Sequence, residues 1–252
     1  MGRRTPPKGV SENAGATDLF GTTPEDAAAQ GTEGHRTRMR ARLLLAGPEA
    51  LADHEMLEML LFLALPRRDT KPIARELLRR FGGFGPVVAA PVAELRAVEG
   101  LGDAGIAALK LAQAAASRLL RGQLAARPVL GSWTALTDYL RAALGFEKAE
   151  QFHVLFLDGR CRLIADEVMG RGTINHAPVY PREIARRALE LHASMVILAH
   201  NHPSGSTEAS RDDVAMTREV RRAFQPLGVA LYDHLIVTSD MCVSMLQQGL
   251  LG

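Results

Sequence analysis

At positions 195–203 the chain reads Met-Val-Ile-Leu-Ala-His-Asn-His-Pro, and after six more residues it reads Ser210-Arg211-Asp212-Asp213. The apolar run predicts a short buried β-strand, which the proline ends. Side chains at i and i+2 of a strand share one face, so His200 and His202 can point at one object. Asp213, at the start of a predicted helix, adds a carboxylate. Two histidines and one aspartate with a fourth position left for water are typical of a catalytic zinc site, so we expect one Zn²⁺ per chain.

The stretch from Ser210 to Asp213 has a second interpretation. A serine followed three residues later by a carboxylate is also the pattern of a capping box, with Ser210 at the N-cap of the helix. The two roles are compatible, because the start of a helix is a rigid place on which to mount a metal ligand.

These residues resemble the JAMM metal motif of the MPN (JAB) domain. Further segments are similar to its RadC-like, UPF0758-type branch, and the resemblance covers roughly residues 130–252, with a weaker one over roughly 35–120. The segments are Phe156-Leu157-Asp158, Arg171-Gly172-Thr173, Ala177-Pro178-Val179-Tyr180-Pro181-Arg182-Glu183 and Asp233-His234-Leu235-Ile236-Val237. The chain departs from the family pattern at His176, where a small polar residue is usual, and at Met245, where Phe is usual.

The resemblance implies a zinc hydrolase that cleaves a peptide or isopeptide bond with metal-activated water. It implies a general base at the start of the strand that follows the first helix of the domain, which is Glu150 here, with Glu167 as the runner-up. It also implies that Ser210 hydrogen-bonds the tetrahedral intermediate or the metal-bound water. The expected partner of this site is a peptide or protein substrate.

The chain divides into four predicted regions: a disordered tail over 1–34, an all-helical domain over 35–121, a linker over 122–131 and the MPN/JAB domain over 132–252. For the last region we predict an α/β (α+β) fold with a mixed sheet between helices. Within 35–121, helices are expected over 36–45, from 53 to before Pro66, from 71 to 81, and twice within 95–120. Beyond 131, helices are expected over 132–144, 182–191 and 212–224, and strands over 151–157, 162–168, 195–199, 228–237 and 243–245.

The turn Gly100-Leu101-Gly102 resembles a helix-hairpin-helix element. Glycines permit positive φ angles and close backbone approach, and the N-terminus of the next helix can hold a phosphate oxygen. Residues 35–127 carry 15 Lys and Arg against 9 Asp and Glu, so DNA is an expected partner of this region. Two other interpretations stay open: the glycines form a plain helix connector beside the repelling Asp103, or the basic surface is merely solvated.

A function of another class competes with the hydrolase. In this alternative the chain is a DNA-binding repair or recombination accessory protein, and its MPN domain is structural or vestigial. An intact ligand set favours the enzyme, since a structural domain has no need of an open metal position. The basic region and the glycine turn favour nucleic acid, and both functions can hold at once.

The other histidines and the cysteines give weaker indications. His54 starts a pattern like His-Glu-x-x-His, but the second histidine is missing, and His153 receives no role. His192 and His234 lie among apolar residues and are expected to be core histidines. No run approaches the ~20 apolar residues of a membrane span, and the first residues lack the apolar region of a signal peptide, so we expect neither a membrane span nor a leader segment. Cys161 and Cys242 lack metal-type spacing, so we expect reduced thiols and a cytoplasmic location.

Overall fold

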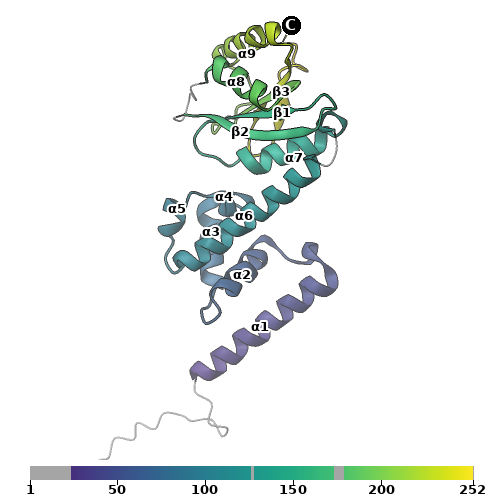
Figure 1. Ribbon diagram of the computed structural model, residues 1–252. Coiled ribbons are helices and arrows are strands. Elements are labelled where there is room, and N and C mark those ends of the chain that lie inside the picture. Colours follow the sequence, from purple (N-terminus) through teal and green to yellow (C-terminus); the bar gives the residue numbers. More distant parts are fainter. Residues whose placement is uncertain (1–23, 126–127, 173–178, 252) are drawn as a thin grey trace, which may run out of the picture.

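The chain folds into a helical region and a sheet region joined by one long helix (Figure 1). The computed structural model describes residues 24–125, 128–172 and 179–251. In the helical region the elements are α1 (Pro24–Ala46), the 3-10 turn η1 (Pro48–Ala50), α2 (Asp53–Ala64), α3 (Lys71–Phe81), α4 (Phe84–Ala89), α5 (Val92–Arg96) and α6 (Gly102–Ala125). In the sheet region they are η2 (Val129–Gly131), α7 (Trp133–Leu144), β1 (Gln151–Leu157), β2 (Leu163–Arg171), α8 (Pro181–Glu190), β3 (Met195–Asn201), α9 (Arg211–Phe224), η3 (Gln225–Leu227), β4 (Ala230–Val237) and β5 (Cys242–Ser244).

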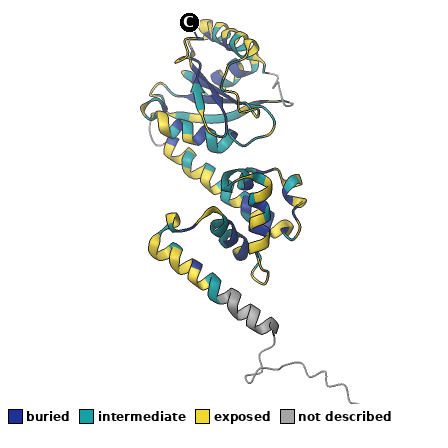
Figure 2. Ribbon diagram, turned by 180° about the vertical axis from the view of Figure 1, so that it is seen from behind, coloured by how far each residue is buried: buried dark blue, intermediate teal, exposed yellow. Residues whose placement is uncertain are grey.

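The helical region has its own apolar core. Aliphatic side chains from α2 to α6 form it, among them Leu57, Leu61, Leu77, Leu95 and Leu109, each with no exposed surface. Burial of leucines at helical spacing is the main stabilising term for such short helices. Figure 2 shows the coloured part of α1, from residue 34 on, as mostly exposed, whereas α2 to α6 turn buried residues toward one another.

The sheet has the strand order β2-β1-β3-β4-β5, in which only the β3–β4 pair is parallel. Alternate residues of the central strands point to opposite faces, as the two-residue period of a strand requires. One face, with Leu155, Ile197 and Leu235, packs on α7. The other, with Val154 and Leu198, packs on α8 and α9. The predicted mixed sheet between helices is therefore confirmed.

Helix α6 belongs to both regions. Its first half contributes Leu109 to the helical core, and its end contributes Leu124 to the core under α7. In Figure 1 it runs from the helical region up to the sheet. The expected linker over 122–131 is thus helical up to Ala125, and Val129, which is 1% exposed, packs with Leu124. The helix continues because Ala, Leu and Gln favour it and Leu124 finds an apolar surface to cover.

A second contact joins the two regions near the start of β1. The ring of Phe146 lies over Gly85 of α4 so closely that a Cβ atom there would come within 2.9 Å of it. Lys148 Nζ pairs with Glu94 of α5 at 2.6 Å. The loop between α7 and β1 is therefore packed against the helical region.

Several expected boundaries need correction. We expected a tail over 1–34, and its residues 1–23 lie outside the described part of the chain. Its residues 24–34 belong to α1, which begins at Pro24 and not at the expected residue 36. Helix α4 was not expected, because Gly83, Gly85 and Pro86 are typical of a turn. The helix forms nevertheless, because Pro86 lies in its first turn, where the missing N–H costs no hydrogen bond. The helix before the glycine turn has only five residues, Val92–Arg96. Met245 is fully buried with Ile236 and so occupies an apolar position; His176 lies outside the described residues.

Candidate metal centre

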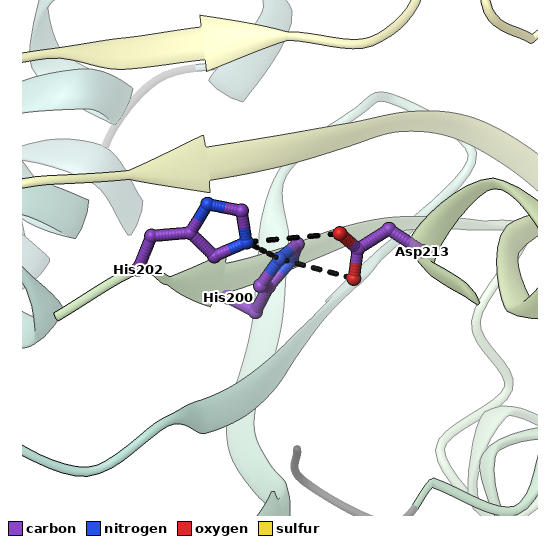
Figure 3. Close-up of side chains that lie close together, drawn as sticks. All are labelled: His200, His202 and Asp213. Carbon is purple, nitrogen blue, oxygen red and sulfur yellow. Dashed lines mark hydrogen bonds and ion pairs between the residues drawn. The ribbon is translucent and has the colours of Figure 1, made fainter. Parts of the chain in front are cut away.

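His200, His202 and Asp213 converge at the end of β3 that faces the start of α9 (Figure 3). One ligand atom from each lies within 4.8 Å of the others. The two Nε2 atoms are 2.9 Å apart, Asp213 Oδ1 is 3.3 Å from His200 Nε2, and Asp213 Oδ2 is 3.6 Å from His202 Nε2. Two ligands on one zinc ion, each at about 2.05 Å in tetrahedral geometry, would be roughly 3.3 Å apart. The cluster therefore has the size of a metal centre.

The fold supplies the two sides of this cluster from rigid elements. His200 is the sixth residue of β3 and stacks on Phe152 of β1, with ring centroids 6.2 Å apart. His202 follows the strand, where its backbone N–H still donates to Val237 at 2.9 Å. Asp213 lies in the first turn of α9, where a complete capping box holds it. The expected cap is thus confirmed, and it coexists with the ligand position.

Hydrogen bonds orient both imidazoles toward the cluster. His202 Nδ1 lies 2.9 Å from the carbonyl oxygen of Ser206, which can only accept, so Nδ1 carries the hydrogen and Nε2 keeps its lone pair when the ring is neutral. His200 Nδ1 lies 2.8 Å from Nε2 of His234 on β4. The Nε2 atoms of His200 and His202 and the carboxylate of Asp213 then form a set of electron-pair donors. A proton or a metal ion between them relieves their mutual repulsion, so the donor set fits a cation.

The contacts within the cluster shift the pKa values of its members. Burial raises the pKa of Asp213, but hydrogen bonds with His200, His202 and Ser210 outweigh it and hold that pKa well below its usual range. The bond to Asp213 raises the pKa of His202, and the charge of Glu150 adds to this. Burial lowers the pKa of His234 well below its ordinary value, so this imidazole is neutral.

Glu150 lies at the same end of the sheet as the cluster. Phe152 pairs with His200 across the β1–β3 ladder, so the residue two positions earlier is level with His202. Because β1 runs antiparallel to β3, the start of β1 meets the end of β3. The expected general base is therefore brought beside the candidate ligands.

Glu167, the runner-up, lies elsewhere and is committed to another partner. Its carboxylate forms a bidentate pair with the guanidinium of Arg187 on α8, with Nη2 to Oε1 at 2.6 Å and Nε to Oε2 at 2.8 Å. It pairs with Val154 across the β1–β2 ladder, two residues further from the ligand end than Phe152. This arrangement favours Glu150.

Ser210 contacts the candidate ligand Asp213 directly. Its hydroxyl accepts from the backbone N–H of Asp213 at 3.1 Å and donates to the Oδ2 atom of Asp213 at 2.7 Å. The side chain therefore holds the carboxylate while it lies at the edge of the cluster.

Two polar residues that support the site have no signature in the local sequence. Asn201 is 1% exposed, and its side chain bonds three backbone groups of the loop that carries Glu150. His234, expected to be a core histidine, is indeed fully buried, but it also bonds the candidate ligand His200. Both depend on which strands become neighbours, which local patterns do not reveal.

Three other histidines of the described residues, His54, His153 and His192, lie apart from the cluster. His192 was expected in the core but is exposed, since it follows the last turn of α8 with a left-handed φ of 52°. That position commonly ends a helix, and the next N–H bonds back to Ala188. His153 bonds Asp166 at 2.9 Å. His54 lies in the first turn of α2, in the helical region.

The glycine turn has the backbone that its sequence predicts. Gly100 and Gly102 have positive φ angles of 82° and 60°, and α6 begins at Gly102. Leu101 has no exposed surface, so only its backbone can meet a ligand. Arg68 donates to the carbonyl of Gly100 at 2.8 Å, and Arg96 lies 3.5 Å from the Asp103 carboxylate.

Comparison with known proteins identifies the family. A family model described as RadC-like JAB domain matches residues 130–250, and one described as UPF0758 N-terminal matches residues 34–107. A UPF0758 protein of Rhodobacter capsulatus is 52% identical over 213 residues, which cover 84% of this chain and all of that protein. The chain belongs to the UPF0758 family. A second UPF0758 protein, from Ruegeria pomeroyi, is 48% identical over 86% of this chain and 97% of its own length.

The family assignment confirms the resemblance seen in the sequence and the RadC-like JAB fold of the sheet region. Within the described part of the chain, none of the helices combines the length and apolar character needed to cross a membrane. Cys161 and Cys242 are free cysteines.

Proposed function

We propose that this UPF0758 protein is a zinc-dependent hydrolase that cleaves a peptide or isopeptide bond. The observation that carries the proposal is the convergence of two imidazole Nε2 atoms and one carboxylate within 4.8 Å, on a RadC-like JAB domain. Three protein ligands leave a coordination position for water or substrate, which a structural zinc site does not. The side chains of His202 and Asp213 remain partly exposed, so a substrate can reach the cluster.

Each residue has a distinct part in the proposed reaction. A bound zinc ion supplies Lewis acidity, which polarises a carbonyl and lowers the pKa of water to about 7. The Glu150 carboxylate takes the proton of the attacking water and returns it to the leaving amine nitrogen. The Ser210 hydroxyl turns from Asp213 toward the oxyanion that develops on the attacked carbonyl, and donates to it.

Metal analysis of the purified protein tests the proposal. We expect about one zinc per chain in the wild type, and a collapse of zinc content in His202→Ala and Asp213→Ala. His54→Ala, a histidine change in the helical region, is the control and should keep its zinc. A screen of peptides and of lysine-linked isopeptides with the zinc-loaded protein then tests hydrolysis. Full zinc content in both ligand variants would reject the site, and zinc without any hydrolysis would favour a binding role.

The helical region favours a second function, which is the binding of DNA by the glycine turn. The turn offers the backbone N–H groups at the start of α6, and Arg68 and Arg96 lie beside it. Asp103 would repel a phosphate, but Arg96 lies near its carboxylate and reduces that repulsion. We propose sequence-tolerant contacts to the phosphate backbone, since N–H groups and arginines that bind phosphate do not read bases.

A further inference from the structure

A chain of buried polar contacts leads from His200 back to Asp213. His200 Nδ1 lies 2.8 Å from His234 Nε2, His234 Nδ1 lies 2.6 Å from Thr217 Oγ1, and Thr217 Oγ1 lies 2.6 Å from the backbone carbonyl oxygen of Asp213. His234 and Thr217 have no exposed surface. This chain of contacts therefore links the two sides of the candidate metal centre, β3 and α9, through β4 and without solvent.

The backbone carbonyl group of Asp213 sets the direction of every hydrogen bond in this chain of contacts. A carbonyl oxygen can only accept, so the single hydroxyl hydrogen of Thr217 goes to Asp213. Thr217 Oγ1 must then accept from His234, which places a hydrogen on His234 Nδ1. His234 is fully buried and its two hydrogen-bond partners are a hydroxyl and a second imidazole, so its ring is neutral and its Nε2 is an acceptor. His200 consequently donates through its Nδ1–H, and its Nε2 is left with a lone pair.

We infer that Thr217 and His234 are positioning residues that fix His200 in its Nδ1–H tautomer and so direct its Nε2 lone pair at the metal. The inference rests on the proposed zinc function, because it assigns to buried residues the preparation of one ligand. Thr217 is four residues after Asp213 on α9, so the same hydroxyl also ties this tautomer to the helix that presents the carboxylate.

The choice of a histidine for this task has an electrostatic consequence. Ligand histidines most often donate their second ring N–H to a carboxylate or a carbonyl. A carboxylate in place of His234 would put a second buried negative charge close to Asp213. The neutral imidazole of His234 orients His200 by hydrogen bonding alone. The Phe152 ring packs edge-on against the His234 ring, with the two ring centroids 5.5 Å apart, and excludes water from it.

Long-range ¹H–¹⁵N NMR of the metal-free protein reads the tautomer directly and needs neither substrate nor zinc. At a pH where His200 is neutral, we expect the wild type to carry the His200 hydrogen on Nδ1. In Thr217→Val, which keeps the shape but removes the hydroxyl, His234 can turn to its Nε2–H form and force the His200 hydrogen onto Nε2. Zinc affinity, measured by chelator competition, should then fall by about 10- to 100-fold.

Thr217→Ser is the matched control, because it keeps the hydroxyl. It should retain the wild-type tautomer and bind zinc within about threefold of the wild type, whereas a defect caused by packing alone would not be restored by this smaller residue. Observation of the His200 hydrogen on Nε2 in the wild type would overturn the inference, even if the valine variant fails to fold. So would a folded Thr217→Val protein with unchanged tautomer and zinc affinity. A wild type with the expected tautomer but no affinity for zinc would reject the proposed function and leave the orientation of His200 confirmed.

Discussion

The side-chain oxygen of Asn201 accepts a hydrogen bond from the backbone N–H of Gln151 at 2.8 Å. The Nδ2 atom of the same residue donates to the carbonyl oxygens of Glu147 and Ala149, at 3.1 Å each. Asn201 lies between the two candidate ligand histidines in the sequence, but its side chain holds the loop that ends in Glu150. The end of β3 therefore positions both candidate ligand histidines and the loop of the candidate base.

We predict that Asn201→Leu loosens this loop and leaves the metal centre intact. The change removes the side-chain partner of one backbone N–H and two carbonyl groups, and the cost is at most about 1–3 kcal/mol for each group, because the loop is only half-buried and water can replace part of the lost bonding. Hydrogen exchange of residues 147–151 should become faster than in the wild type, while zinc content stays the same. Gln248→Leu, the same kind of change at an exposed position, should alter neither. If Asn201→Leu loses its zinc while the fold is kept, then Asn201 supports the ligands rather than the loop.

Glu150 and Glu167 differ in their predicted effect on turnover. Once a substrate is found, Glu150→Gln should lower kcat by about 10²- to 10⁴-fold with zinc content unchanged, because the amide cannot take a proton. Glu167→Gln should leave kcat near the wild-type value and only weaken the pair with Arg187. Steady-state kinetics of the two zinc-loaded variants decide between them, and the opposite pattern would transfer the role to Glu167.

Local patterns predicted the ligand side of the site and missed its supports. The two-residue spacing of His200 and His202 and the cap of Ser210 are short-range features, and both are present in the structure. The contacts of Asn201 and His234 reach over 34 to 54 residues, because β1, β3 and β4 become neighbours only in the folded sheet. Strand order and register are long-range properties that the patterns of single segments do not supply.

The helix boundaries also divide into those that local sequence predicts and those that depend on packing with distant segments. The start of α9 was predicted to within one residue, because Ser210 marks it chemically. The end of α6 was missed by several residues, because the sheet region stabilises its last turn through Leu124. Tertiary packing of this kind overrides local propensity.

The metal-free protein should lose stability as the pH rises above neutral. The folded pKa of His202 is raised by Asp213, so its contribution is full below the unfolded value of about 6.5 and is lost as the pH rises through the folded pKa. The folded pKa of Asp213 is lowered, so its contribution is present above about 3.9 and is lost as the pH falls through the folded pKa. Thermal melting of the chelated protein should therefore show a maximum between about pH 4 and 6.5.

Zinc should reverse the alkaline part of this profile. Zinc displaces the proton from His202, so its affinity rises by up to about tenfold per pH unit until the histidine is deprotonated. The increase in Tm on addition of zinc should consequently be larger at pH 8 than at pH 6. Asp213→Asn removes the partner that raises the pKa of His202 and should flatten the profile of the metal-free protein. An equal zinc shift at the two pH values would contradict the displacement of a proton.

The nucleic-acid proposal predicts that binding depends on the arginines at the glycine turn. Leu124 at the end of α6 packs into the core of the sheet region, so the full chain is the proper material for this test. Fluorescence anisotropy with random duplex DNA should show affinity that falls as salt rises, because phosphate contacts release counterions. The double variant Arg68→Gln/Arg96→Gln should bind more weakly, and the slope of log affinity against log salt should shrink by about 0.9 for each phosphate that the variant no longer neutralises.

A matched pair of arginines on the sheet region separates this local effect from that of total charge. Arg218 and Arg222 are on α9, and changing both to Gln lowers the net charge by the same amount. If the glycine turn holds the phosphates, this control variant keeps the wild-type affinity and salt slope, since charges further away than the Debye length of about 8–10 Å are screened. Equal decreases in both double variants would mean that DNA responds only to overall charge. No binding by the wild type at low salt would make the turn a helix connector, and Gly100 and Gly102 would then serve only to reverse the chain between α5 and α6.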